Sequence, residues 1–353
     1  MNPATPPQAD DAPAPISVPP DHVLGPDTAI RDLLTIAAPG SRAHDITVVG
    51  DTGIDLMVRV EGLPGRDEKA IGEHLGIFGG GMGANFATAA TRARPDLEVA
   101  FVSRVGSDAF GQQCLADLQS EGVDTRYVHI EPDGVTWWCA VALDATGEKA
   151  LLGGRTSASL PERTDLPEGL LAQTRWVHML GDIPFSAELV ELARAHGALS
   201  SVDIEGSFVD ADPARAGWLA ASADLVVINA SGLRALTHRD DPIDAGLHLL
   251  RSGPSTGPRM LVITLGARGA LVLHRDANGP WQAHAQPAIP VDVVDSTGAG
   301  DSFAGTFVAG LVAGDPIGTT TARAAQAAAT TLGALGSRGR PLPTIRPTTG
   351  GTT

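Results

Sequence analysis

Near its C-terminal end the chain carries the run Val293-Val294-Asp295-Ser296-Thr297-Gly298-Ala299-Gly300-Asp301-Ser302-Phe303-Ala304-Gly305. Its apolar start favours an extended backbone, and the residues that follow predict a helix over about 302–311. The small residues between them let several backbone N–H groups converge without interference from side chains. The start of a helix adds unpaired N–H groups and a positive dipole end. The run therefore predicts an anion hole, which suits a transferring phosphoryl group.

Asp301 stands at the predicted start of this helix, and two roles fit it. An aspartate at an N-cap accepts a hydrogen bond from the first turn of its helix. A carboxylate beside an anion hole can also accept the proton of an attacking hydroxyl group. The residues alone leave both roles open.

Upstream of this run, short apolar segments alternate with amphipathic ones. The predicted strands are 46–50, 99–105, 137–143, 176–180, 199–204, 225–229 and 260–265, and the predicted helices are 84–94, 112–121, 187–195 and 243–250. Such alternation is typical of a mainly parallel sheet with helices on both faces. The nearly continuous apolar segment 225–228 fits a strand that is buried on both sides. We therefore predict an α/β protein with a three-layer αβα core.

Two regions depart from this alternation. Segment 56–60 with 75–78, and segment 137–143 with 150–152, have the pattern of amphipathic strand pairs. The second pair flanks a predicted hairpin turn, Asp144-Ala145-Thr146-Gly147. A small sheet of such strands, over about 55–80 and 135–155, predicts a lid over a cleft, with an ordinary surface hairpin as the alternative. Trp137 and Trp138 would either stack on a sugar or base, or pack between lids.

The composition excludes several classes of protein. A formal net charge of −16 disfavours binding to nucleic acid or anionic lipid. The only lysines, Lys69 and Lys149, lie outside any G-x-x-x-x-G-K-[ST] motif, which excludes a P-loop. No apolar stretch approaches the ~20 residues of a membrane span, and no secretory signal begins the chain, so we expect a cytoplasmic protein.

The two ends of the chain differ from its middle. Residues 1–42 and 341–353 have little hydrophobic periodicity and predict mobile tails around one domain, 43–340. Two cysteines, Cys114 and Cys139, are too few for a disulfide framework and are interpreted as small buried side chains.

The string from Asp295 to Asp301 closely resembles the second signature of the ribokinase-like (PfkB) carbohydrate kinases, D-[ST]-T-[GA]-A-G-D. The resemblance implies the ribokinase-like fold, with a small β-sheet lid. It also implies transfer of the γ-phosphoryl group of ATP to a hydroxyl of a sugar or sugar-like acceptor. Asp301 would be the general base, and Gly298, Ala299 and Gly300 would form the anion hole. With the ordinary aspartate pKa near ~4, Asp301 would be a weak base whose position matters most.

Four further segments extend the resemblance over about residues 45–338. They are Val49–Asp55, Gly80–Asn85, Val105–Gly111 with Gly122–Asp124, and Thr264–Gly269. The resemblance implies acceptor contacts from Asp55, Gly81, Gly83, Asn85 and Asp182. Of these five, Asp182 is a candidate that lies outside the motifs. The resemblance also implies nucleotide contacts from Asn229, Thr264, Gly266, Gly269 and Gly300. It further implies a monovalent-cation site, for K⁺, from Asp295, Thr297, Ala328, Thr331, Gly333 and Ser337.

The chain also departs from the family pattern. Asn229 opens the family's N-x-x-E motif, but Gly232 stands where a glutamate orders water on Mg²⁺. The carboxylates of Asp203 or Glu205 are candidates to replace it. Met82 stands where many relatives have lysine, which favours an unphosphorylated acceptor. The roles of Asp182 and Arg155 are not fixed by any motif.

Other functions remain as alternatives. A nucleoside kinase of the adenosine or pseudouridine type is the closest, and a non-catalytic sugar- or nucleotide-binding protein on the same fold is another. The intact Asp301 argues against the second. A loose dinucleotide fingerprint, Gly79-x-Gly81-x-x-Ala84, lacks the buried strand that should precede it. The expected cofactors are ATP, Mg²⁺ and K⁺, and the expected assembly is a homodimer through the lid.

Overall fold

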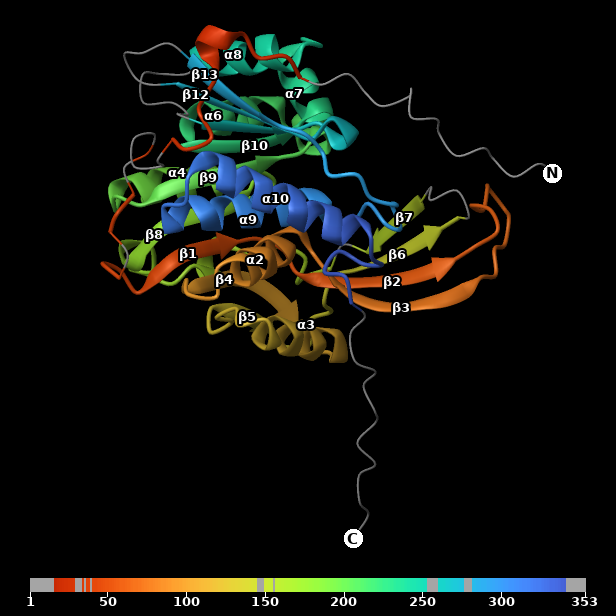
Figure 1. The fold of residues 1–353 in the computed structure, drawn as a ribbon. Coiled ribbons are helices and arrows are strands. Elements are labelled where there is room, and N and C mark those ends of the chain that lie inside the picture. Colours follow the sequence, from red (N-terminus) through yellow and green to blue (C-terminus); the bar gives the residue numbers. More distant parts are fainter. Residues whose placement is uncertain are drawn as a thin grey trace, which may run out of the picture.

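The computed structural model describes residues 16–28, 34, 36–38, 40–144, 149–154, 156–252, 260–275 and 281–340. A nine-stranded sheet in the order β13-β12-β11-β10-β9-β8-β1-β4-β5 crosses this part of the chain (Figure 1). Its strands are β1 (His44–Val49), β4 (Val99–Gly106), β5 (Val128–Glu131), β8 (Thr174–Leu180), β9 (Leu199–Ile204), β10 (Leu225–Asn229), β11 (Met260–Thr264), β12 (Ala270–Arg275) and β13 (Trp281–Gln286). Pairing is parallel from β5 to β11 and antiparallel from β11 to β13.

Helices cover both faces of this sheet, as predicted (Figure 1). One face packs against α2 (Met82–Ala93), α9 (Ala299–Ala313) and α10 (Ile317–Leu332), and the other packs against α4 (Ser186–Ala195), α5 (Gly206–Ala211), α6 (Pro213–Ser222), α7 (Ala230–Thr237) and α8 (Pro242–Ser252). Helix α3 (Ala109–Ser120) lies beside β4 and β5. In β10, Val226 and Ile228 belong to the core between the sheet and helices α4 to α8. Leu225 and Val227 belong to the core between the sheet and helices α2, α9 and α10. Two-sided burial therefore explains the continuous apolar run of this strand.

A separate four-stranded sheet has the order β3-β2-β6-β7 (Figure 1). It consists of β2 (Gly53–Arg59), β3 (Glu73–Gly80), β6 (Trp138–Leu143) and β7 (Lys149–Gly154). These are the regions predicted to form the lid. Of the predicted hairpin turn, residues 145–147 lie outside the described residues, as does Arg155. Trp138 packs with Ile54, Val105 and Cys114, whereas Trp137 lines a cleft beneath the sheet.

The predicted segments agree with the structure best where burial is strongest. Strands β9 and β10 match their predicted ranges residue for residue. Helix α9, however, begins at Ala299 rather than at 302, because Gly298 adopts the left-handed conformation (φ 77°) that ends the preceding loop. Strands β5 and β13 and helices α5 to α7 are absent from the prediction. Most of these elements have ten residues or fewer, too few to show a clear hydrophobic period.

The prediction of a mobile tail over residues 1–42 is wrong for part of that segment. Val23 forms a bridge with Ala283 of β13, and the ring of His22 stacks on Trp281. Leu24 is 1% exposed and belongs to the core beneath α9 and α10. A few apolar residues suffice here because the edge strand β13 offers them backbone partners and an apolar surface. Residues 1–15 and the predicted tail 341–353 lie outside the described part of the chain.

A smaller expectation is also met. Both cysteines are free and buried. Among the described helices, none combines the length and apolar character needed to cross a membrane.

Candidate active site

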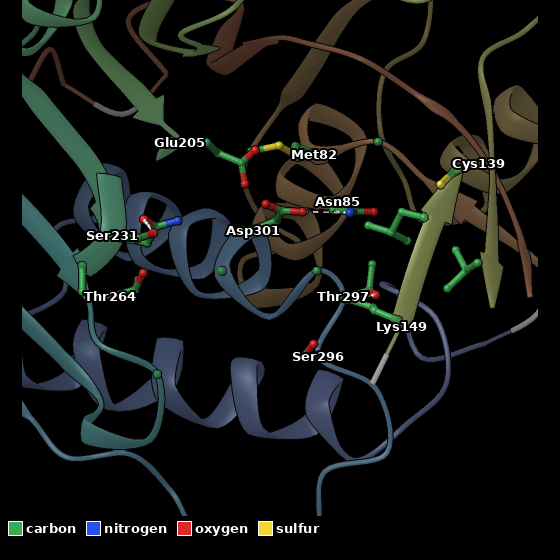
Figure 2. A pocket seen from close by; sticks show the side chains of 18 of the residues that line it. Met82, Asn85, Cys139, Lys149, Glu205, Ser231, Thr264, Ser296, Thr297 and Asp301 are labelled. Carbon is green, nitrogen blue, oxygen red and sulfur yellow. Dashed lines mark hydrogen bonds between the residues drawn. The ribbon is translucent and has the colours of Figure 1, made fainter. Parts of the chain in front are cut away.

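The carboxyl ends of the parallel strands meet at one edge of the main sheet, where open α/β sheets bind ligands. A cleft of about 990 Å³ lies at this edge, between the sheet and the strands β6 and β7. Its walls contain most of the residues predicted for the site, and also polar side chains from outside the motifs. Met82, Asn85, Lys149, Glu205, Thr264, Thr297 and Asp301 line it (Figure 2). Asp51, Asp55, Gly81, Asn229, Gly298 and Gly300 line it as well. The structure therefore brings residues from all parts of the predicted domain into one cavity.

The anion-hole run folds as a left-handed turn followed by the first turn of α9. Gly298 has φ 77°, and a Cβ atom there would lie 2.5 Å from the Cβ of Ser337, so only glycine fits. A Cβ atom on Gly300 would meet nothing within 4 Å, which leaves its backbone open to the cleft. Asp301 lies within the first turn of α9, and Gly298 is the N-cap of this helix. Asp301 is therefore not the helix cap, which was one of the two roles left open by the sequence.

Asn85 fixes the orientation of Asp301. Its Nδ2 donates a hydrogen bond to Oδ2 of Asp301 at 2.8 Å (Figure 2). Its Oδ1 accepts hydrogen bonds from Ser337 Oγ at 2.9 Å and from Arg338 Nε at 3.1 Å. These donors define which side of the amide faces Asp301. The family resemblance assigns Asn85 to the acceptor hydroxyls, whereas in the structure its side chain holds the carboxylate of Asp301.

Arg338 completes this arrangement, and the sequence analysis does not identify it. The residue is 6% exposed. Its guanidinium group donates to Asp117 Oδ2 at 2.6 Å and to the carbonyl oxygen of Gly80 at 2.8 Å. A chain of polar contacts thus runs from Asp117 through Arg338 and Asn85 to Asp301. No signal in the sequence marks it, because Arg338 lies in a glycine-containing loop outside every motif.

The surroundings of Asp301 change its acidity. Burial raises the pKa of its carboxyl group to about 7; the hydrogen bond from Asn85 opposes this shift, and the charges of Glu205 and Asp51 add to it. The expectation of a weak base with an ordinary pKa is therefore corrected. A carboxylate with this pKa is well matched to proton acceptance near neutral pH.

The acceptor end of the cleft is rich in carboxylates. Asp55 is 6% exposed, and none of the described residues donates a hydrogen bond to its side chain. Burial raises the pKa of Asp55 to about 6, with Arg338 opposing. Asp51, which the sequence analysis does not single out, accepts a hydrogen bond from the backbone N–H of Gly83 at 3.0 Å. Burial, together with Asp182 and Asp55, raises its pKa to about 7.

Two more carboxylates lie close to this end. Desolvation raises the pKa of Asp203 well above its ordinary value, and the charges of Asp301, Glu205 and Asp182 act in the same direction. Desolvation also raises the pKa of Glu205, and the charge of Asp182 adds a smaller shift in the same direction. Asp182, Asp203 and Glu205 line a small cavity beside Met82. Asp182, a predicted acceptor residue, therefore lies at the same end of the sheet as Asp203 and Glu205.

The two predicted glycines at the start of α2 act through packing. Gly81 has φ 91°, and a Cβ atom there would lie 2.6 Å from the Cα of Thr52. A Cβ atom on Gly83 would lie 2.6 Å from the Cα of Gly50. Their missing side chains let the loop after β1 approach the start of α2. Gly81 lines the cleft, whereas Gly83 is buried.

At the nucleotide end, the cleft adjoins an apolar pocket of about 260 Å³. Thr264, Gly266, Gly269 and Gly300 border it, and its remaining walls are mostly apolar, including Ala288, Ile289, Phe303, Ala325, Ala328, Ala329 and Leu332. Asn229 reaches the cleft as the N-cap of α7, because its Oδ1 accepts from the backbone N–H of Gly232 at 2.7 Å. Four of the five predicted nucleotide residues thus border the apolar pocket, and Asn229 lines the adjoining cleft.

Gly232 is a packing residue as well as a departure from the motif. A Cβ atom there would lie 3.2 Å from Asn229 Oδ1, from the backbone N of Gly206 and from the carbonyl oxygen of Ile204. A glutamate at this position would therefore require the start of α5 to shift.

Comparison with known proteins identifies the family. Residues 43–345 match the sequence model of the pfkB family of carbohydrate kinases. The chain belongs to this family. It is 30% identical to an ATP-dependent ribose-1-phosphate kinase of Halopiger xanaduensis over 295 residues, which cover 83% of this chain and 93% of the relative. It is 27% identical to a deoxyribokinase of Salmonella typhi over 270 residues, which cover 74% and 84% of the two chains.

Solved structures agree on the fold. A ribokinase of Arabidopsis thaliana, determined with ribose and ATP, superposes with a TM-score of 0.69 at 23% identity, over 84% of this chain and 95% of that one. The expected ribokinase-like fold is confirmed, and the protein is an enzyme of the carbohydrate-kinase class.

The residues expected around K⁺ lie just before α9 and at the end of α10. Asp295 is 3% exposed, and its Oδ1 accepts from the N–H and the hydroxyl of Thr297 at 2.9 and 2.7 Å. The hydroxyl of Thr331 bonds to Ser302, and that of Ser337 donates to the carbonyl oxygen of Gly79. These side-chain oxygens are hydrogen-bonded within the chain. Ala328 lines the apolar pocket.

Carboxylates, imidazoles and thiols form no metal-binding cluster in the part of the chain that the structure describes.

Proposed function

We propose that this kinase transfers the γ-phosphoryl group of ATP to a hydroxyl group of an unphosphorylated sugar. The observation that carries the proposal is the position of Asp301 in the cleft, beside the open backbone of Gly300 and held by Asn85 at 2.8 Å. On one side of it lies the carboxylate-rich acceptor end, and on the other side lies the apolar pocket.

The acceptor is assigned from charge. Asp51 and Asp55 line the space where the acceptor would lie, with Met82 at its edge, and Asp182 acts on Asp51 through its charge from the adjoining small cavity. Carboxylates accept hydrogen bonds from sugar hydroxyls and repel a phosphate group. The cleft therefore favours a neutral sugar over a sugar phosphate such as the one in the name of the Halopiger relative.

The reaction follows from this arrangement. The acceptor hydroxyl oxygen forms a bond to the γ-phosphorus, the bond from that phosphorus to the bridging β–γ oxygen breaks, and ADP leaves. Asp301 Oδ accepts the hydroxyl proton. The backbone N–H groups at Gly298, Ala299 and Gly300 stabilise the charge that develops on the phosphoryl oxygens.

The nucleotide end explains how ATP would bind. The apolar pocket fits an adenine ring, and Thr264, Gly266 and Asn229 lie between this pocket and Asp301. Magnesium supplies neutralisation of the phosphate charge when it is bound with ATP. Glu205 in this cleft and Asp203 in the adjoining small cavity are carboxylates that could order its water molecules, since Gly232 has no side chain for this purpose.

The small sheet is assigned as the lid. Trp137, Cys139, Val141 and Leu151 from its strands line the cleft, so its closure would exclude water from the reaction. The predicted homodimer would use the outer surface of β7, where Leu152 is 68% exposed. A cytoplasmic location, where ATP is available, fits this function.

A nucleoside is the second candidate acceptor. Its support is Trp137, whose ring lines the cleft and offers a surface on which a base can stack. A panel of pentoses, hexoses and nucleosides, followed by ADP release, distinguishes the two.

Substitution of the base tests the proposal. In Asp301→Asn, kcat should fall by roughly 10²-fold or more, the scale of a lost general base, while the fold is retained. ADP release with the best acceptor measures the rate, and circular dichroism checks the fold. A rate near that of the wild type would contradict the assignment of Asp301 as the base.

A further inference from the structure

Lys149 is the first residue of β7 and one of only two lysines in the chain. Its Nζ donates a hydrogen bond to Thr297 Oγ1 at 2.8 Å and lies 3.9 Å from Asp295 Oδ1 (Figure 2). The side chain is 24% exposed, so the ammonium group is partly withdrawn from solvent. Lys149 thus joins a strand of the lid sheet to the start of the anion-hole run.

Asp295 requires a positive partner. Its side chain is 1% exposed, and an isolated carboxylate buried to this degree is costly unless it is hydrogen-bonded and paired with a charge. Backbone N–H groups of Thr297 and Gly336 and the hydroxyl of Thr297 supply hydrogen bonds. Among the described ion pairs, the one that reaches Asp295 comes from Lys149.

Thr297 connects the two charged groups. Its hydroxyl accepts from Lys149 and donates to Asp295, so its single proton is directed toward the carboxylate. The orientation of Thr297 is therefore fixed on both sides, immediately before Gly298. Any loss of the ammonium group would leave Asp295 without its counter-charge and Thr297 without its donor.

We propose that the ammonium group of Lys149 takes the place of the monovalent cation expected beside Asp295 and Thr297, so that this kinase works without added K⁺. The proposal rests on the proposed function, because the anion hole that follows Thr297 is the one used in phosphoryl transfer. Since Lys149 belongs to the lid sheet, the position of β7 and the geometry of the anion hole are linked.

The test removes the charge and offers a free cation instead. Lys149→Met keeps much of the aliphatic stem without the charge, and Lys149→Arg keeps the charge. Lys69→Met is the matched control, because Lys69 is exposed in the segment between β2 and β3. Each protein is assayed for ADP release, and for thermal unfolding without substrate, in potassium chloride and in tetramethylammonium chloride at equal ionic strength.

For the wild type and for Lys69→Met, the rate in the two salts should agree within twofold, and so should the unfolding temperature within each protein. For Lys149→Arg, whose own rate can differ from that of the wild type, the ratio of the rates in the two salts should also stay within twofold. In tetramethylammonium, Lys149→Met should lose activity by tenfold or more. Potassium should restore part of this activity and raise the unfolding temperature of Lys149→Met alone.

Two results would overturn the proposal. One is a wild-type rate that falls tenfold or more when potassium is withdrawn. The other is a wild type that potassium stabilises against heat as strongly as it stabilises Lys149→Met. The unfolding measurement needs no acceptor, so it decides the role of Lys149 even if the acceptor panel finds no phosphorylated sugar and the proposed function fails.

Discussion

The two ends of the cleft are built from different parts of the polypeptide. At the proposed anion hole, backbone N–H groups of neighbouring residues would act together. Gly298 and Gly300 contribute there through the absence of a side chain. At the acceptor end, Asp51 from the loop after β1 and Asp55 from β2 line one cleft, and Asp182 lies in the adjoining small cavity. A site made of backbone groups is formed by one continuous run of residues, whereas a site made of side chains depends on the register and packing of several elements.

The largest effect should come from the anion hole. Gly298→Ala places a Cβ atom 2.5 Å from Ser337 and forces a non-glycine residue to φ 77°. A left-handed conformation alone costs roughly 1–2 kcal/mol, so Gly298→Ala should unfold at a lower temperature and lose about 10²-fold in kcat. Gly300→Ala is the matched control, since its Cβ atom meets nothing within 4 Å of the chain.

The thermal stability of Gly300→Ala should equal that of the wild type, and only the KM for ATP should rise. Equal loss of stability in both variants would show that the left-handed turn is not the critical feature of this end.

The acceptor end should respond through binding. Asp55→Ala removes a buried carboxylate that has no donor among the described residues and would accept two hydrogen bonds from sugar hydroxyls. At roughly 0.5–1.5 kcal/mol for each bond, the KM for the acceptor should rise by about tenfold. Calorimetry with ATP should show an unchanged affinity. If the affinity for ATP falls instead, Asp55 belongs to the nucleotide end.

The dependence of the rate on pH connects the two ends. With a pKa of about 7, Asp301 is half-protonated near neutral pH, and only its ionised form accepts a proton. The value of kcat/KM should therefore reach a plateau above this pH and be about tenfold lower at pH 6. Asn85→Ala removes a hydrogen bond that lowers the pKa of Asp301, so the acidic limb should move to higher pH. A limb that stays in place would show that another group controls it.

The smallest effect concerns stability. The pKa of Asp51 is about 7 in the folded protein, compared with an ordinary value of 3.8, so folding takes up a proton between these values. Its contribution therefore destabilises the fold progressively as the pH rises from about 4 to about 7. Asp51→Asn retains the acceptor for the N–H of Gly83 but cannot ionise.

At pH 8, Asp51→Asn should unfold about 1–2 °C above the wild type, the change that ~1 kcal/mol produces in a chain of 353 residues. The difference should diminish toward pH 4. A constant difference over this range would exclude ionisation of Asp51 as its cause.

The sequence predicted the main architecture because the central strands are buried on both faces. Alternate residues of β10 enter the two cores on opposite sides of the sheet, which requires apolar residues at every position. Short elements at the edges, such as β13 with its partner Val23, lack this signal. Their structure depends on a neighbour that is distant in the chain, and no local period records that neighbour.

The anion hole and the position of Asp301 in it were determined by the sequence itself, because a left-handed glycine, small residues and a helix start must follow one another along the chain. The tertiary structure alone decided the direction in which Asp301 points and its pKa of about 7. It also decided the hydrogen bond that Asp301 accepts from Asn85, which is itself bonded to Arg338. The same is true of Lys149, which is separated from Thr297 by 148 positions in the chain. Burial and charge act through space, so they become defined only once the sheet, the lid and the C-terminal loop have packed together.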